Sequence, residues 1–279
     1  GDGSPRSLRI TEFESMIGEI SNRQANGQFS IDHRLHLRCE LGYETVADIV
    51  SEYAEHPLLS LISLMDHTPG QRQFAKLDKF REYYMGKHGM SETEVDDFIR
   101  DRIAAQKAHA ITSRTDLVKL GNEHNLAMAS HDDATVEHVQ QAVAEGVTIS
   151  EFPTTLDAAK EAHSQQLQVL MGAPNLVLGG SHSGNVSAME LAELNLVDLI
   201  SSDYVPHSLL LSIFIIAAAT NKPVHEAMRP VTMNPAKAIG LESDRGTLEV
   251  GKRADLLTVH LKNNIPRLTR VISQGQRVA

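Results

Sequence analysis

Six apolar segments of this chain have the composition of β-strands, and each ends on charged or imidazole side chains. These side chains belong to Glu40, Asp66 with His67, His131, Glu151, His182 and Asp203. Segments with helical spacing separate the apolar ones, and this alternation predicts a parallel α/β fold. Because the C-terminal ends of parallel strands meet on one rim, we expect these side chains to converge there. The sequence therefore predicts a functional site at that rim.

The alternation gives six predicted units, each a strand followed by a helix. The strands are expected at residues 31–41, 58–65, 125–130, 147–150, 175–178 and 197–200, and the helices at 45–55, 91–120, 136–145, 156–170, 188–194 and 208–219. A further helix is expected before them, at 10–23. Ser91 and Glu94 have the spacing of a capping box, which predicts the start of the long helix. Residues 74–90 are expected to form an insertion over the rim.

Composition limits the class of protein. With 279 residues and 41% apolar content, the chain can bury one large core, or one core with a small second domain. A formal charge of −10 argues against binding to nucleic acid or to an anionic membrane surface. The longest apolar stretch, 208–220, is too short to span a bilayer. A single cysteine, Cys39, and the lack of a recognisable secretory signal at the start predict a cytoplasmic protein.

Each candidate residue has a structural alternative. Asp203 could bind a metal ion and take a proton from its water, or it could cap the next helix. His131, which precedes two aspartates, could ligate a metal, or the segment could be a turn with hydrogen-bonded aspartates. Glu40 ends a strand with other polar residues on the same face, which could line a wet cavity or face solvent at a sheet edge. Glu151 could be a ligand or simply lead into a helix.

Other residues suit the binding of an anion. His67 and Arg72 follow a strand in one polar loop and could contact an anionic substrate, although either alone is usually a surface residue. Residues 179–185 form a glycine-rich loop that includes His182, and its free backbone N–H groups could bind phosphate. A loose glycine loop is a weak indication by itself.

Two segments near the C-terminus, TMNPAKAIGL (232–241) and GTLEVGKRADL (246–256), resemble the signature of the amidohydrolase superfamily. The phrases HRLHLRCE (33–40), DHTPGQRQF (66–74), ISEFPTT (149–155) and SSDYVP (201–206) are narrower. They resemble the PhnM family of phosphonate metabolism, the α-D-ribose 1-methylphosphonate 5-triphosphate diphosphatases. The resemblance implies a (β/α)8 TIM barrel in residues 1–240, with about six units visible, and the C-terminal strands of a small β domain in 241–279.

The resemblance also implies an activity and roles for residues. A metal-dependent hydrolase would cleave the ribose triphosphate to the 5-phosphate and pyrophosphate by metal-activated water. Glu40 takes the position of the strand-four bridging ligand, His131 that of the strand-five histidine, and Asp203 that of the strand-eight ligand and general base. Glu151 is the fourth expected ligand and stands where many relatives have a histidine.

Several cations would be needed to neutralise so negative a substrate. The candidates are Arg38, His67, Arg72 and His182. Zn²⁺ is the metal expected first, with Mn²⁺, Ni²⁺, Fe²⁺ and Mg²⁺ as alternatives, since mixed nitrogen and oxygen ligands select weakly. We expect a homodimer that acts on a small phosphorylated ribose phosphonate.

The chain departs from the superfamily pattern at its start. The superfamily has a His-x-His motif on its first strand, and here no two histidines are two residues apart. We therefore expect the first two strands and the first half of the β domain to lie outside this sequence. Two other functions stay open: an amidohydrolase that opens a cyclic amide or deaminates a base, and a non-catalytic barrel subunit of a phosphonate-processing assembly.

Overall fold

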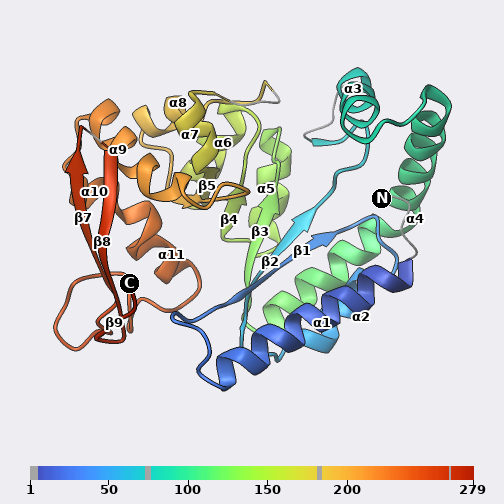
Figure 1. Cartoon of the computed structure of the whole chain (residues 1–279). Coiled ribbons are helices and arrows are strands. Elements are labelled where there is room, and N and C mark those ends of the chain that lie inside the picture. Colours follow the sequence, from blue (N-terminus) through green and yellow to red (C-terminus); the bar gives the residue numbers. More distant parts are fainter. Residues whose placement is uncertain (1–5, 73–76, 181–183, 264) are drawn as a thin grey trace.

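The computed structural model describes residues 6–72, 77–180, 184–263 and 265–279. Its main sheet has six parallel strands, each hydrogen-bonded to its neighbours in the sequence (Figure 1). They are β1 (Leu35–Glu40), β2 (Leu59–Met65), β3 (Ala127–His131), β4 (Ile149–Glu151), β5 (Gln168–Gly172) and β6 (Leu199–Ser201). The curled sheet, with helices outside it, is a partial TIM barrel, as the sequence predicts.

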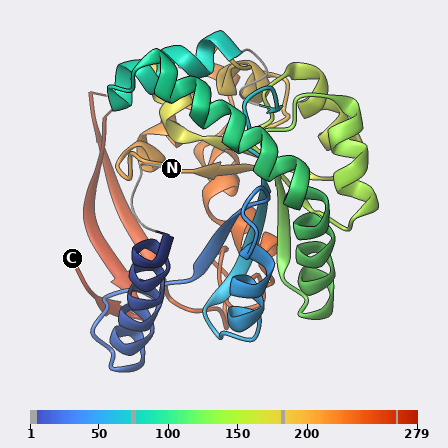
Figure 2. The same cartoon turned by 90° about the vertical axis from the view of Figure 1, so that its right-hand side faces the viewer.

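Helices connect the strands and cover the outer face of the sheet (Figure 2). They are α1 (Arg6–Ala25), α2 (Val46–Tyr53), α3 (Leu77–His88), α4 (Glu92–Glu123), α5 (Val136–Ala144), α6 (Leu156–Ser164), α7 (Ala173–Leu178), α8 (Ala188–Glu193), α9 (Ser208–Thr220), α10 (Val224–Ala227) and α11 (Met233–Ala238), with a 3₁₀ turn at Arg229–Val231. The main core lies between sheet and helices and includes the buried side chains of Leu64, Leu117, Val139, Val169 and Leu191. Among the described residues, no helix has both the length and the apolar character needed to cross a membrane.

Three further strands form a separate antiparallel sheet at the C-terminal end of the chain (Figure 1). They are β7 (Leu256–Lys262), β8 (Ile265–Ser273) and β9 (Gln276–Arg277). This sheet lies within the part predicted to belong to the small β domain. The domain boundary at residue 240 itself stays a prediction.

Local capping explains where several helices begin. The capping box at the start of α4 is confirmed: the Ser91 hydroxyl accepts a hydrogen bond from the backbone of Glu94, whose carboxylate accepts one from the backbone of Ser91. Thr135 and Thr155 cap α5 and α6 in the same way, each accepting from the third residue beyond it. These bonds satisfy N–H groups that the first turn of a helix leaves free. Each threonine thereby ends the loop after a strand and starts the next helix.

One unit differs from the prediction. The expected helix at 156–170 ends at Ser164, and Gln166 turns the chain with a φ of 66°. The strand then occupies Gln168–Gly172, whereas the expected strand at 175–178 lies within helix α7. Both are short apolar segments, which periodicity alone cannot assign to helix or strand. The glycine-rich loop therefore follows a helix, and His182 lies outside the described residues.

The predicted insertion is a helical hairpin. Helix α3 and the N-terminal half of α4 lie together beyond the end of β2 (Figure 1). They share a small core of their own, formed by Phe80, Val95 and Ile99. The C-terminal half of α4 instead packs on the main core through Leu117. The hairpin is thus an extension of an ordinary barrel helix past the rim.

An ion-pair cluster joins the segment before β1 to the segment before β7. The Asp32 carboxylate accepts a hydrogen bond from the Arg253 guanidinium and lies 3.6 Å from that of Arg245. The hydrogen bond from Arg253, together with the charges of both arginines, lowers the pKa of Asp32 below its usual range, although burial opposes this. The cluster fixes the start of the barrel sheet to the start of the small sheet.

We expect Asp32→Asn to lower the free energy of unfolding by about 1–3 kcal/mol at pH 7. Because the folded-state pKa of Asp32 is lowered, its contribution is complete above the unfolded pKa, about 4, and disappears as the pH falls through the folded value. The difference between wild type and variant, measured by urea unfolding from pH 7 to pH 3, should therefore shrink at the acid end. Asp116→Asn, an exposed change on α4, is the control and should differ little from wild type. A pH-independent difference would contradict the ion-pair explanation.

Candidate metal centre

A cavity of about 270 Å³ opens at the C-terminal ends of the barrel strands. Residues from strand ends across the sheet contribute to its wall, including Arg38, His67, His131, Asp132, Phe152 and Asp203. Four of the predicted site residues, Arg38, His67, His131 and Asp203, are thus brought together. This is the convergence expected at the rim of parallel strands.

Two histidines and one aspartate form a cluster in this cavity. The Nε2 atoms of His67 and His131 lie 3.5 and 3.4 Å from Oδ2 of Asp132. One donor atom from each residue lies within 4.8 Å of the other two. Asp132 directly follows β3 and has a φ of 54°, a left-handed conformation that aspartate tolerates better than most residues. This turn holds its carboxylate beside the imidazole of His131, its own neighbour in the chain.

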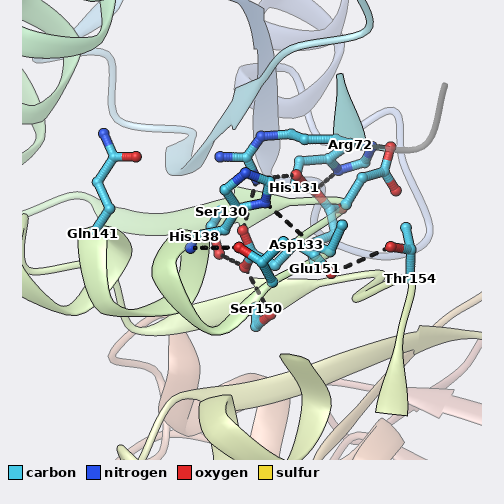
Figure 3. Close-up of polar contacts among 12 residues, drawn as sticks. Arg72, Ser130, His131, Asp133, His138, Gln141, Ser150, Glu151 and Thr154 are labelled. Atoms are coloured by element: carbon cyan, nitrogen blue, oxygen red, sulfur yellow. Dashed lines mark hydrogen bonds and ion pairs between the residues drawn. The ribbon is translucent and has the colours of Figure 1, made fainter. Parts of the chain in front are cut away.

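A carboxylate binds the Nδ1 atom of each imidazole. Nδ1 of His67 lies 2.8 Å from Oε2 of Glu40, and Nδ1 of His131 lies 2.7 Å from Oε2 of Glu151. A carboxylate can only accept, so each Nδ1 carries the proton and donates it. With Nδ1 bound in this way, Nε2 of each ring is the atom that can act as a ligand when it carries no proton. Figure 3 shows the bond between His131 and Glu151.

The two carboxylates are themselves fixed. Glu40 also accepts a hydrogen bond of 2.9 Å from the backbone N–H of His67. Glu151 accepts one of 2.8 Å from the buried hydroxyl of Ser63 on β2. Burial alone would raise the pKa of Glu151, but the hydrogen bond and charge of His131 lower it to about 2. Glu151 is therefore an ionised group that orients His131.

The cluster fits a bound cation. Oδ2 of Asp132 is buried, and its contacts to the Nε2 atoms of His67 and His131, at 3.5 and 3.4 Å, are long and weak for a carboxylate oxygen. Burial lowers the pKa of His67, but hydrogen bonds to Asp132 and Glu40 outweigh it and raise the pKa to about 9. Both observations indicate that this position favours positive charge. Two imidazole nitrogens and a carboxylate oxygen are a donor set typical of divalent transition metals.

Two further groups in the cavity are charged. Nη2 of Arg38 lies 3.3 Å from Nε2 of His131, so its guanidinium reaches the cluster directly. Asp203 lies two residues beyond β6 with a φ of 48°. Desolvation in the cavity raises the pKa of Asp203, although the charge of Arg38 opposes it. A carboxylate with a raised pKa accepts a proton more readily than an ordinary aspartate.

The other predicted residues lie around the cavity in different ways. Glu40 and Glu151 contact the imidazoles instead of lining the cavity wall, and their predicted roles as direct ligands stay predictions. Arg72 is buried against Asp133 and is not itself among the residues that line the cavity. The sequence patterns assign no separate role in the site to Asp132. Its position directly after a strand-ending histidine is the signal that could have identified it.

The strand order corrects one position in the comparison with the superfamily. His131 ends β3 and Asp203 follows β6, the third strand after β3, just as strand eight of a barrel is the third after strand five. Counted the same way, Glu40 on β1 takes the strand-three position, and the placement at strand four is wrong. The strand-four position belongs to β2, which leads into His67.

Comparisons with known proteins agree with this geometry. The amidohydrolase family model matches residues 80–278. The α-D-ribose 1-methylphosphonate 5-triphosphate diphosphatase of Escherichia coli is 42% identical over the whole chain, which spans 74% of that relative's length. An imidazolonepropionase of Sphingopyxis alaskensis is 29% identical over 55% of the chain and 36% of its own length.

A solved structure supports the fold. The crystal structure of N-acetylglucosamine-6-phosphate deacetylase from Pasteurella multocida superposes with a TM-score of 0.57 at 14% identity. The match covers 99% of this chain and 74% of the deacetylase. Members of the amidohydrolase family typically depend on divalent metals, in accord with the donor set described above. The chain is therefore a hydrolase that belongs to the amidohydrolase family and, within it, to the PhnM family that its sequence phrases resemble.

Proposed function

We propose that the chain hydrolyses α-D-ribose 1-methylphosphonate 5-triphosphate to the 5-phosphate and pyrophosphate, with a divalent metal ion as cofactor. The observation that carries the proposal is the convergence of two imidazole Nε2 atoms and the Asp132 carboxylate in a cavity that also holds Asp203 and Arg38. The 42% identity to the Escherichia coli diphosphatase supports the choice of substrate. The activity belongs to the catabolism of phosphonates.

The proposed metal ligands are His67, His131 and Asp132, with Asp203 facing them in the same cavity. When bound, a divalent cation would supply Lewis-acid chemistry, polarising a phosphoryl oxygen and making water more acidic. We assign Glu40 and Glu151 to the orientation of the imidazoles, because their carboxylates already accept the Nδ1 protons. Zn²⁺ is the preferred metal, since two histidines and a carboxylate are a common zinc set.

Asp203 is the proposed general base. It would accept a proton from the attacking water as the new bond to the α-phosphorus forms and the bond to pyrophosphate breaks. Its raised pKa and its open position at the cavity suit this role. Arg38 would stabilise the negative charge that develops on the phosphate oxygens. Phe152 and Pro174 contribute apolar surface to the wall of the same cavity.

The residues predicted to contact phosphate now differ in how well the structure supports that role. Arg38 keeps that role, because its guanidinium lines the cavity. His67 is proposed as a metal ligand instead. Arg72 stays a predicted phosphate contact with less support, since Asp133 already binds its guanidinium.

We infer a reducing, cytoplasmic setting from Cys39, a buried free thiol whose pKa burial raises to about 12. The homodimer stays a prediction.

The test is ³¹P NMR of the purified protein with the ribose triphosphate, first with Zn²⁺ or Mn²⁺ and then with a chelator. We expect the signals of pyrophosphate and of a 5-phosphomonoester to appear together, and we expect chelation to stop their growth. Imidazolonepropionate, a cyclic amide, is the comparison substrate because a relative of that activity matches part of the chain. Turnover of the cyclic amide with no release of pyrophosphate would contradict the proposed function.

A further inference from the structure

A second charged group lies behind the candidate metal centre. The Asp133 side chain is fully buried and accepts hydrogen bonds from the hydroxyls of Ser130 and Ser150 at its Oδ2 atom. Its Oδ1 atom lies 2.6 Å from Nη1 of Arg72, whose side chain is only 7% exposed. Figure 3 shows Arg72 reaching toward His131 and Asp133. Neither Arg72 nor Asp133 lines the cavity itself.

The position of Arg72 in the chain connects this pair to the metal centre. Arg72 ends the polar loop that begins at Asp66 and carries His67. Its Nη1 atom donates to the backbone oxygen of His131 at 2.7 Å as well as to Asp133. The guanidinium thus joins the loop of one candidate ligand to the backbone of another.

The loop is anchored at its other end too. Oδ2 of Asp66 accepts a hydrogen bond of 3.1 Å from Gln106 on α4, and Oδ1 accepts one of 3.0 Å from the backbone of Thr68. His67 lies between this anchor and Arg72. Its backbone N–H is already bound to Glu40. The position of the His67 ring relative to His131 therefore depends on contacts at both ends of the loop.

Burying an ion pair is an expensive way to stabilise a fold. Both charges must leave water, and a well-packed apolar pair of the same volume is often as stable. Here the remaining lone pairs of Asp133 are satisfied by two serine hydroxyls, and its backbone oxygen accepts from Thr154 on the next loop. Such a network fixes one arrangement of its partners. The arrangement it fixes is that of three strand ends, β2, β3 and β4.

We propose that the Arg72–Asp133 pair is a positioning element of the metal centre, and that it sets the spacing between His67 and His131. Neither residue is proposed to touch the metal or the substrate. The inference rests on the metal site of the proposed function, but it does not depend on which substrate is hydrolysed. It assigns Arg72 to the geometry of the cofactor site, in place of the phosphate contact predicted from the sequence.

The experiment compares two arginines that pair with carboxylates. Arg72→Met removes the proposed positioning contact. Arg114→Met is the matched control, because the Arg114 side chain is 9% exposed and lies 2.6 Å from Glu145, at the end of α5. Co²⁺ is titrated into the metal-free forms of both variants and of the wild type. Affinity and visible absorption spectrum are measured, together with the thermal midpoint of each protein.

We expect Arg72→Met to weaken Co²⁺ binding by about tenfold or more, within the range of about 10–100-fold for residues that orient metal ligands. Its spectrum should also shift, because the ligand geometry changes. Arg114→Met should lower the thermal midpoint to a similar extent and leave affinity and spectrum unchanged. Arg72→Lys keeps a charge but loses the two-way contact, and it should recover only part of the affinity.

Equal Co²⁺ affinities and spectra for wild type and Arg72→Met would overturn the proposal. An equal loss of affinity in Arg114→Met would overturn it as well, since the effect would then follow general destabilisation. If Arg72→Met does not fold, Arg72→Lys and Ser150→Ala carry the same comparison. A wild type that binds Co²⁺ but releases no pyrophosphate would refute the proposed reaction and leave this comparison valid.

Discussion

Asp203→Asn is expected to lower kcat by about 10²–10⁴-fold, the usual contribution of a positioned general base. The amide keeps the size and most hydrogen bonds of the carboxylate, but it cannot accept the proton of an attacking water. The backbone N–H of Asp203 donates to the hydroxyl of Ser201, and its left-handed φ is one that asparagine also tolerates. Circular dichroism and the thermal midpoint should therefore stay close to those of the wild type.

Pyrophosphate release is the measurement, and Asp116→Asn is the control for an aspartate lost on the exposed surface. A titration with Zn²⁺ separates the two roles proposed for Asp203. A base that is not a ligand leaves Zn²⁺ affinity unchanged in the asparagine variant, whereas a ligand weakens it. Normal turnover by Asp203→Asn would show that the proton goes elsewhere and that the proposed mechanism is wrong.

Much of the fold could be predicted from local patterns. The strands that lead to His131 and Glu151 are mainly apolar segments, whereas the strand that leads to Glu40 alternates apolar and polar residues. The structure has strands at all three. The capping box at Ser91 is also a local signal, since both partners lie within one turn. The position of strand β5 was predicted wrongly because two short apolar segments follow each other in the sequence. Which of the two forms the strand depends on contacts with β4 and β6.

The site was harder to predict because its roles depend on pairs of residues distant in sequence. Glu40 and His67 are 27 positions apart, and only the pairing of β1 with β2 places the carboxylate on Nδ1 of the imidazole. A strand-ending carboxylate that orients a ligand and one that is a ligand have the same local sequence. Arg72 is similar: its partner Asp133 is 61 positions away, so a buried ion pair could not be distinguished from a phosphate contact.

His67→Ala separates the two roles that have been assigned to this residue. If His67 is a metal ligand, its removal should weaken Zn²⁺ binding by more than roughly 100-fold, because losing a ligand costs more than losing an outer partner, about 10–100-fold. If it contacts phosphate instead, Zn²⁺ affinity should stay the same and KM should rise. The geometry favours the first outcome, since Nε2 of His67 lies 3.5 Å from Oδ2 of Asp132.

Two further variants make this result specific. His163→Ala removes a half-exposed imidazole on α6 and should leave Zn²⁺ affinity unchanged. Glu40→Gln keeps an acceptor oxygen for His67 but removes the charge, so its loss of affinity should be smaller than that of His67→Ala. If Glu40→Gln abolished binding while His67→Ala retained it, Glu40 would be the direct ligand. The ring of His67 would then serve the substrate, as the sequence alone suggests.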